Sequence, residues 1–296
     1  MWHNRVVVGY DGSDISAIAA RWGAREAQAR GLGLTLINAM VPPTSSGSLG
    51  PGISVGLDTL EEIRLSAQQA LDEFAATLPA GDVQSLVQVG SPSGVLLTAS
   101  ETAELVVVGS RGHGGFKELL LGSVSAQLVA HAVCPVIVIR EEPAADKEVV
   151  VVGVDGSPAG HGAIGFAFDM ASRHGWKVLA IHAWDVPSFD LIVLPNTPVP
   201  VDIDNMAGTE VRLAAEILAG YEAQYPDVEL ETRVVHGSPV NALLSAVPEA
   251  AMIVVGTRGH GQVMSSILGS VSHGVLHRSH IPVAVVSEPV GDDDAA

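Results

Sequence analysis

The chain contains nearly the same eight-residue segment twice, 144 positions apart. Residues 6–13 read VVVGYDGS and residues 150–157 read VVVGVDGS, so seven of the eight positions are identical. Further along, Gly90-Ser91-Pro92 returns as Gly237-Ser238-Pro239 at an offset of 147, which places a three-residue insertion in the second copy. Such a period is much longer than the ~20–50 residues of a solenoid repeat. The 296 residues therefore predict two copies of one domain, residues 1–142 and 148–290, with a linker at 143–147 and an acidic tail at 291–296.

The composition is that of a folded protein without a membrane span. Hydrophobic residues make up 47% of the chain and charged residues 16%, which argues against extended disorder. The longest apolar runs fall far short of the ~20 residues that a spanning helix needs. An acidic residue, Asp11, comes before any long apolar stretch, so we expect no secretory signal. The single cysteine, Cys134, cannot form an intrachain disulfide, and these features together favour a cytoplasmic protein.

The net charge restricts the partners that the chain can bind. Thirty-three acidic residues against fifteen basic ones give −18, and the second copy carries most of the excess. Non-specific binding to nucleic acid or to an anionic membrane needs a cationic face, so neither is expected. A negatively charged ligand would have to be held locally, against an unfavourable overall field.

Within each copy, strand and helix patterns alternate. In the first copy we expect strands at residues 5–9, 34–40, 84–89, 105–109 and 135–139, with helices between Ser13 and Gly31, from 58 to about 78, at 92–102 and from about 122. This order predicts an α/β fold with a parallel sheet that has helices on both faces. Ligands bind such sheets beyond the carboxyl ends of the strands, where the strand order reverses. Any site should therefore follow the strands that end at Gly9 and Gly109.

A glycine-rich segment follows the fourth strand in both copies with the same spacing. The first copy has Gly109, Gly112, Gly122 and Ser123, the second has Gly256, Gly259, Gly269 and Ser270, and ten of seventeen positions are identical. Glycines let backbone N–H groups approach a ligand closely, and a helix N-terminus attracts an anion. The segment is not a P-loop, because it lacks the required lysine. The alternative is a flexible loop with turn glycines, or a loop whose ligand role has lapsed.

A carboxylate follows the first strand of both copies. Asp11 and Asp155 could bond to ribose hydroxyls or brace the loop. As an alternative, Asp-Gly-Ser is also good turn and helix-cap chemistry. The glycine segment in the same repeat favours the ligand-binding interpretation.

Histidine and cysteine are the remaining candidates for reactive groups in this chain. His273, His277 and His280 have near-helical spacing, but the first copy lacks them, so a surface helix end is the preferred interpretation rather than a metal site. His113 and His260 lie in the glycine segment and could serve as general bases or as loop donors, of which we favour the second. Cys134 precedes a proline at a strand start and indicates a buried apolar position.

These residues together resemble the universal stress protein family in its tandem two-domain bacterial form. The ATP-binding subgroup of that family carries G-x2-G-x9-G-[ST], and both glycine segments fit this pattern without a gap. The resemblance also covers the opening VVVG-x-DGS, the Gly-Ser-Pro before the third helix and the closing apolar strands, and so spans nearly the whole chain.

The resemblance implies two tandem Rossmann-like domains of the adenine nucleotide alpha hydrolase-like type, each with five parallel strands. It implies ATP, with Mg²⁺, as the ligand, with Asp11 and Asp155 on the ribose and adenine side and Ala39 and Ala183 beside the base. The phosphates would lie on two loops, made of Gly109, Ser110, Arg111, Gly112, Gly122, Ser123 and Val124 in the first copy and Gly256, Thr257, Arg258, Gly259, Gly269, Ser270 and Val271 in the second. The family also implies pairing through the last strands, as an internal pseudo-dimer and in a further homodimer.

The function that follows is a stress-response regulator whose occupancy by about two ATP controls its conformation or its binding to an unidentified regulatory protein. No catalytic residue and no metal ligand is assigned. The alternatives are a slow ATPase or phosphotransferase and a nucleotide-independent scaffold. The first copy has Lys117 where the second copy has Met264. If Lys117 contacts the γ-phosphate, the two sites would bind ATP with unequal affinity.

Overall fold

The computed structural model describes residues 2–41, 57–112, 121–144, 146–185, 203–259 and 268–288. Contacts among the residues divide the chain into two units. One unit runs to Pro143 and also contains the last strand of the chain, and the other runs from Ala144 to Ser279.

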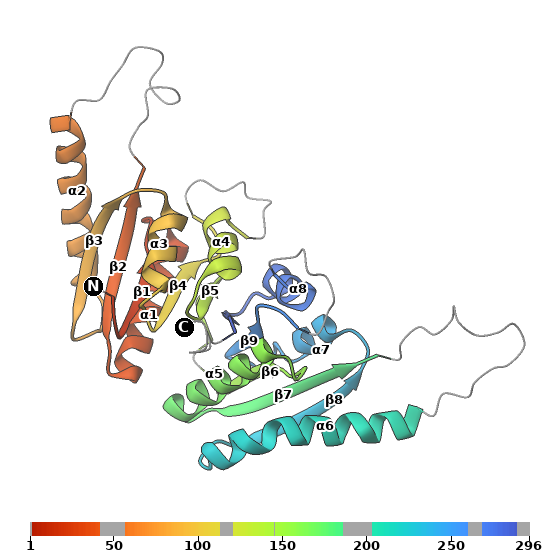
Figure 1. Ribbon diagram of the computed structural model, residues 1–296. Coiled ribbons are helices and arrows are strands. Elements are labelled where there is room, and N and C mark those ends of the chain that lie inside the picture. Colours follow the sequence, from red (N-terminus) through yellow and green to blue (C-terminus); the bar gives the residue numbers. More distant parts are fainter. Residues whose placement is uncertain are drawn as a thin grey trace, which may run out of the picture. The chain divides into compact units, whose positions relative to one another are not determined.

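Strands and helices alternate in both units, as the sequence predicts (Figure 1). The first unit contains β1 (Arg5–Gly9), α1 (Asp14–Arg30), β2 (Gly33–Met40), α2 (Leu57–Ala75), β3 (Val83–Val89), α3 (Pro92–Ser100), β4 (Leu105–Gly109), α4 (Ser123–His131) and β5 (Val136–Ile139), together with β10 (Val283–Val286). The second contains β6 (Val149–Gly153), α5 (Pro158–His174), β7 (Lys177–Trp184), α6 (Ile203–Gln224), β8 (Leu230–His236), α7 (Pro239–Ser245), β9 (Met252–Gly256) and α8 (Ser270–Arg278).

The helix that follows the first strand begins and ends at the residues that the sequence indicates. Ser13 is the N-cap of α1, and its side chain accepts a hydrogen bond from the backbone N–H of Ser16. Gly31 ends the helix with φ of 65°, a left-handed conformation that favours glycine. The second copy repeats both features, with Ser157 as the N-cap of α5 and Gly175 at its end with φ of 68°. The same local chemistry therefore sets the same helix length in both units.

The first unit has a five-stranded parallel sheet in the order β3-β2-β1-β4-β5, with β10 antiparallel on the edge of β5. The second unit has the parallel order β9-β6-β7-β8. In a right-handed crossover topology, α1 and α2 cover one face of the first sheet and α3 and α4 cover the other. The predicted α/β class, with tandem domains built on mostly parallel sheets, is confirmed. The strand order reverses between β1 and β4 in one unit and between β6 and β9 in the other.

The core of each unit lies between the sheet and its helices. The valines of β1 and β6, Val6–Val8 and Val150–Val152, are fully buried. A strand covered on both faces needs such a continuous apolar run, because neither face meets water. Among the described residues, no helix is long and apolar enough to cross a membrane.

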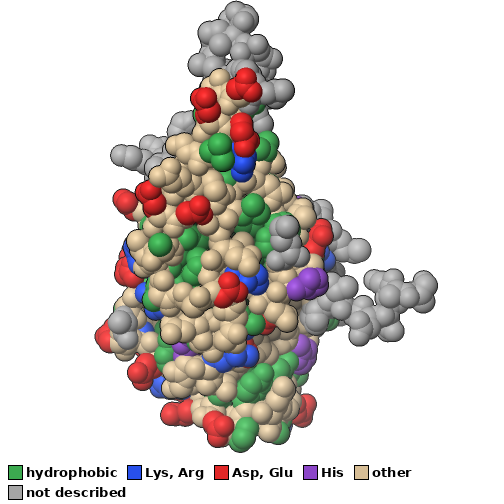
Figure 2. Space-filling model, turned by 90° about the vertical axis from the view of Figure 1, so that its left-hand side faces the viewer, with side chains coloured by type: hydrophobic (Ala, Val, Ile, Leu, Met, Phe, Trp, Pro, Cys, Tyr) green, Lys and Arg blue, Asp and Glu red, His purple; other side chains and the backbone are tan. Residues whose placement is uncertain are grey.

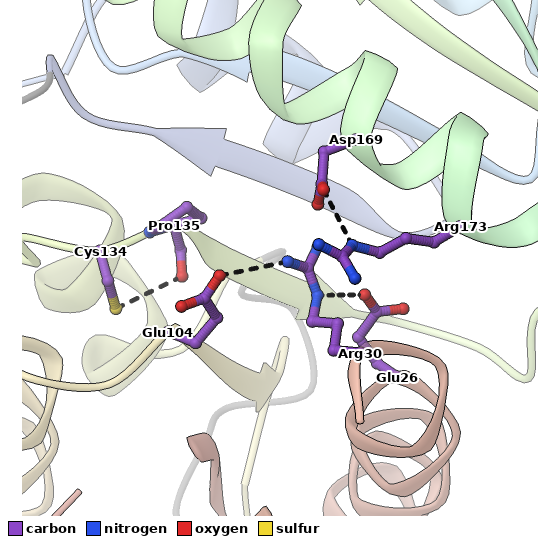
Figure 3. Close-up of polar contacts among 7 residues, drawn as sticks. All are labelled: Glu26, Arg30, Glu104, Cys134, Pro135, Asp169 and Arg173. Carbon is purple, nitrogen blue, oxygen red and sulfur yellow. Dashed lines mark hydrogen bonds and ion pairs between the residues drawn. The ribbon is translucent and has the colours of Figure 1, made fainter. Parts of the chain in front are cut away.

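A buried ion pair closes the last turn of α1 (Figure 3). The Nε atom of Arg30 donates to Oε1 of Glu26 at 2.5 Å, and the side chains are 4% and 1% exposed. Nη1 of Arg30 also donates to Glu104, just before β4, at 3.4 Å. Since an unpaired buried charge is costly, these contacts tie the end of α1 to the start of β4.

Candidate functional site

Each unit has a cavity beyond the carboxyl ends of its strands, at the reversal of strand order. The cavity of the first unit has a volume of about 380 Å³ and that of the second about 770 Å³. The first is lined by Gly9, Tyr10, Asp11, Ser16, Ile37, Ala39, Pro92, Leu96, Val108, Gly109, Arg111, Gly112, Gly122, Ser123, Val124 and Ser125. The second is lined by Gly153, Val154, Asp155, Gly160, Ile181, Ala183, Pro239, Leu243, Val255, Gly256, Arg258, Gly259, Leu268, Gly269, Ser270, Val271, Ser272 and His273. The structure therefore gathers sixteen of the eighteen predicted site residues around two cavities.

The two predicted residues that do not line a cavity are Ser110 and Thr257. Ser110 is 1% exposed, and its carbonyl accepts a hydrogen bond from the backbone N–H of Gly122 at 2.7 Å. Thr257 makes the same backbone contact with Gly269 at 2.7 Å. Both residues therefore hold the start of the following helix against the end of the strand.

The turn after the first strand holds its aspartate in a fixed orientation. Oδ1 of Asp11 accepts hydrogen bonds from the backbone N–H of Ser13 at 3.0 Å and from its hydroxyl at 2.6 Å. Asp155 makes the same contacts with Ser157, at 3.0 and 2.7 Å. The turn chemistry proposed from Asp-Gly-Ser is therefore present, and it presents a carboxylate at the mouth of each cavity.

The second glycine of each glycine segment, Gly112 or Gly259, lies directly against this carboxylate. A Cβ atom added to Gly112 would overlap Oδ2 of Asp11, and one added to Gly259 would overlap Oδ2 of Asp155. Only glycine allows this close approach of the segment to the turn. The spacing of the glycines in the sequence thus has a direct steric cause.

The helix that follows the glycine segment directs its N-terminus at the cavity. Gly122 is the N-cap of α4 and Gly269 the N-cap of α8, and neither supplies a side-chain cap. The first N–H groups of an α-helix have no intrahelical acceptor and carry a partial positive charge. Ser123 and Val124 in one unit, and Ser270 and Val271 in the other, place these groups in the cavity wall. An anion is the ligand that this end of the cavity favours.

Each cavity also has apolar lining residues. Ile37, Ala39, Leu96 and Val108 contribute them in the first unit. Ile181, Ala183, Leu243 and Val255 contribute them in the second. The lining thus combines apolar surface with the polar N-terminus of a helix, which suits a ligand that has both an apolar and a charged part.

Sequence reasoning missed several lining residues. Leu96 and Leu243 have the pattern of ordinary core residues, and only the repeated Gly-Ser-Pro just before them marks their helices as part of the site. His273 is exposed on α8, as the sequence indicates, but it also lines the second cavity, which sequence reasoning did not predict. The centroids of its ring and the ring of His277 lie 4.1 Å apart. Among the described residues, no three His, Cys, Asp or Glu side chains gather as a metal site.

The two cavities differ where the repeats differ. Tyr10 in the first unit stacks on Phe74 of α2, with ring centroids 4.4 Å apart, whereas the second unit has Val154 at that position. Burial, and next the charge of Asp11, raise the pKa of Tyr10. Ser16 lines the first cavity where Gly160 lines the second. These larger side chains in the first unit accompany the smaller cavity.

Basic side chains are few around the cavities. Arg111 and Arg258 each line one of them. Arg140 follows β5, and burial, then repulsion by Arg111, lowers its pKa. On the face shown in Figure 2, acidic side chains are spread among separate basic ones and form no single patch. The positive groups beside these cavities are therefore local ones, a single arginine and a helix N-terminus in each. Lys117, Met264, His113 and His260 lie outside the described residues.

Comparison with known proteins gives consistent matches over the whole chain. The sequence pattern of the universal stress protein family matches residues 3–140 and 148–287. A universal stress protein of Mycolicibacterium smegmatis is 36% identical over 288 residues, which cover 95% of this chain and 96% of that protein. The crystal structure of a universal stress protein from Archaeoglobus fulgidus shares the fold, with a TM-score of 0.69 and 24% identity over 99% of this chain and 98% of that one. A shorter match, over 48% of this chain and 97% of the other, is a universal stress protein in complex with cAMP, with 27% identity and a TM-score of 0.36.

Proposed function

The chain belongs to the universal stress protein family, and from that premise we propose that it is a regulatory protein that binds adenine nucleotides, one ATP in each of its two cavities. Nucleotide occupancy would control its conformation or its binding to a partner protein during stress. Catalysis is not needed for this role.

The observation that carries the proposal is the arrangement that both cavities share. Each brings together an oriented carboxylate, a helix N-terminus capped by glycine and apolar lining residues. The carboxylate suits the ribose hydroxyls, the helix N-terminus suits the phosphates, and the apolar residues suit the base of a nucleotide. Two copies built from residues 144–147 positions apart make a chance arrangement a poor explanation.

The described residues fit the ligand in chemical terms. Asp11 and Asp155 would accept hydrogen bonds from ribose hydroxyls, and Ala39 and Ala183 would lie beside the base. The phosphates would be held by backbone N–H groups from the residues around Gly112 and Gly122, and around Gly259 and Gly269 in the second unit. Glycine there leaves room for an anion to approach the backbone. Mg²⁺ enters the proposal as the counter-ion that a triphosphate carries.

The net charge of −18 does not oppose this proposal, because the attraction that it needs acts at short range. Charges on the surface are screened beyond about 8–10 Å at physiological ionic strength. Backbone N–H groups at a helix N-terminus act within a hydrogen-bond length and need no basic patch. The acidic surface therefore excludes polyanions such as nucleic acid more strongly than it excludes a single nucleotide.

A cytoplasmic location suits the single cysteine. Cys134 is buried, and burial raises the pKa of its thiol to about 12. Such a cysteine remains a thiol in a reducing compartment and has no need of a disulfide partner. We therefore propose that Cys134 serves as a small apolar side chain in the core.

The proposal is tested on protein purified without added nucleotide. Acid release followed by chromatography should detect adenine nucleotide, or calorimetry should show its binding to the emptied protein. Phosphate release with Mg²⁺ and saturating ATP then separates a regulator from an enzyme. Repeated turnover at metabolic rates would favour the ATPase, and a lack of binding at millimolar nucleotide would favour the nucleotide-independent scaffold.

A further inference from the structure

A buried histidine connects the wall of the second cavity to helix α6. His182 on β7 has a side chain that is only 8% exposed. Its Nδ1 atom lies 2.8 Å from the carbonyl oxygen of Val154, and its Nε2 atom lies 2.8 Å from Oε2 of Glu210 on α6. Val154 lines the cavity and precedes Asp155 in the chain. The ring therefore links α6 to the backbone turn that holds the site carboxylate.

In the first unit, the equivalent backbone carbonyl is held by an amide side chain, which does not titrate. Asn38 corresponds to His182 at the offset of 144, and its Nδ2 donates to the carbonyl of Tyr10 at 2.9 Å. Glu210 of α6 corresponds to Ile63 of α2 at the offset of 147. The same offset aligns Leu218 of α6 with Leu71 of α2, and both of these leucines are buried. Ile63 is 46% exposed. The carbonyl is held in both units, but only in the second is it held by a histidine that also contacts a carboxylate.

The two contacts of His182 require a proton. A ring nitrogen that faces a carbonyl or a carboxylate must carry hydrogen, because two lone pairs otherwise oppose each other. With Glu210 ionised, the ring can satisfy both oxygens only when both of its nitrogens are protonated. Loss of one proton breaks either the contact with Val154 or the contact with Glu210. Histidine is the side chain that exchanges a proton near neutral pH.

Other titratable groups lie on the same side of β7. Among the described residues, these include Tyr221 and Tyr225 of α6, whose rings both pack on Phe168, together with His161 of α5 and His236 of β8. His161 contacts the hydroxyl of Tyr221, and His236 lies 3.5 Å from Asp185. Asp155, on the turn itself, is held by Ser157. Glu210 is the group that bonds the ring of His182.

We propose that His182 and Glu210 are a positioning pair for the second cavity, and that they make nucleotide binding there depend on a bound proton while binding in the first cavity does not. The inference rests on the proposed function of the cavities. The proton holds the turn of Asp155 in its binding geometry, so affinity at the second site falls as the pH rises. The sign follows from linkage, since the state that binds nucleotide is the state that holds the proton.

The test compares the two sites in the full chain. In Gly122→Asp the first site is blocked, so the measured ATP affinity is that of the second site. In Gly269→Asp the second site is blocked, so the measured affinity is that of the first. ATP affinity is measured by calorimetry in both variants between pH 6.0 and 8.5. The titration of ATP itself contributes to both sites, so the ratio of affinities removes it. We expect the ratio of second-site to first-site affinity to fall about tenfold as the pH rises, the value of one hydrogen bond to a charged group.

Two substitutions separate proton linkage from a structural role. His182→Asn copies the link of the first unit and should remove the pH dependence of the ratio. Glu210→Gln keeps the side-chain shape and can donate its amide N–H to a neutral ring, so it should retain affinity and also give a flat profile. A ratio that still falls with pH in either variant, or a flat ratio with His182 and Glu210 both present, would overturn the proposal.

A measurement on the nucleotide-free protein tests the positioning pair separately from the proposed nucleotide binding. ¹⁵N NMR of the histidine rings, with His182→Asn for assignment, shows the protonation of His182 in the empty protein. We expect the ring to lose one N–H over the same pH range in which the affinity ratio falls, with a concurrent shift of the amide signal of Asp155. A lack of ATP binding at both sites would refute the proposed function, whereas an unchanged ring between pH 6.0 and 8.5 refutes the positioning pair.

Discussion

Gly112 lies directly against the carboxylate of Asp11 at the first cavity, so close that a Cβ atom at residue 112 would overlap Oδ2 of the aspartate. Gly259 and Asp155 repeat the pair in the second unit. The glycine segment and the turn after the first strand therefore depend on each other sterically.

Gly112→Ala should weaken nucleotide binding at the first site by about tenfold or more, because the aspartate or the segment must shift. Calorimetry should show the loss of one high-affinity site of two. Gly81→Ala is the matched control, since a Cβ atom there meets nothing within 4 Å. Equal affinity in the two alanine variants would contradict the assignment of Gly112 to the site.

Gly122→Asp should abolish binding at the first site and change stability only modestly. Aspartate is a favourable N-cap residue, but its Cβ atom would lie 3.2 Å from the backbone carbonyl oxygen of Ser110, and this tight contact offsets part of the gain from the better cap. Its carboxylate would, however, occupy the anion-binding end of the cavity. Gly122→Asn adds nearly the same side chain without the charge and should weaken binding much less. Similar affinities in the two variants, measured by calorimetry with thermal melting as a check, would speak against the phosphate assignment.

The ion pair between Arg233 and Glu249 makes a small contribution to stability that depends on pH. Nη1 of Arg233 donates to Oε1 of Glu249 at 2.6 Å, and this hydrogen bond lowers the pKa of the glutamate. A carboxyl with a depressed pKa stabilises the fold above its unfolded pKa and loses that effect as the pH falls.

Glu249→Gln should therefore lower the free energy of unfolding by up to about 1 kcal/mol at pH 7, a limit set by solvent screening because both side chains are 39% exposed. The difference from wild type should shrink toward zero as the pH is lowered through the range in which Glu249 takes up its proton. Urea denaturation at several pH values measures it, with the exposed Glu222→Gln as control. A difference that grows as the pH falls would show that the sign is wrong.

Cys134 should be unreactive in the folded protein. Burial raises the pKa of its thiol to about 12, so little thiolate exists at pH 8. The Sγ–H group donates to the carbonyl oxygen of Pro135 at 3.7 Å (Figure 3). An aromatic disulfide reagent should react slowly with the native chain and rapidly with one thiol after unfolding. Fast native reaction would mean that the region around β5 opens readily.

The sequence allowed much of this architecture to be predicted, because the repeat and local chemistry point the same way. Ser13 and Gly31 predict the ends of α1, and the valine runs predict buried parallel strands. The reversal of strand order then places the site beyond Gly9 and Gly109, where the first cavity lies.

Other features depend on tertiary contacts that no local pattern shows. Leu96 resembles a core residue until its helix is placed beside the cavity. His182 and Glu210 are 28 residues apart, and the three-residue insertion obscures their correspondence to Asn38 and Ile63.

The most direct test of the central claim is the stoichiometry of ATP binding to the full chain. Titration calorimetry with Mg²⁺ and ATP on nucleotide-free protein should give about two ATP per chain. Gly122→Asp and Gly269→Asp should each reduce the number to one, and the double variant should bind none. The account would be contradicted by an absence of binding at millimolar ATP, or by a stoichiometry that neither substitution changes.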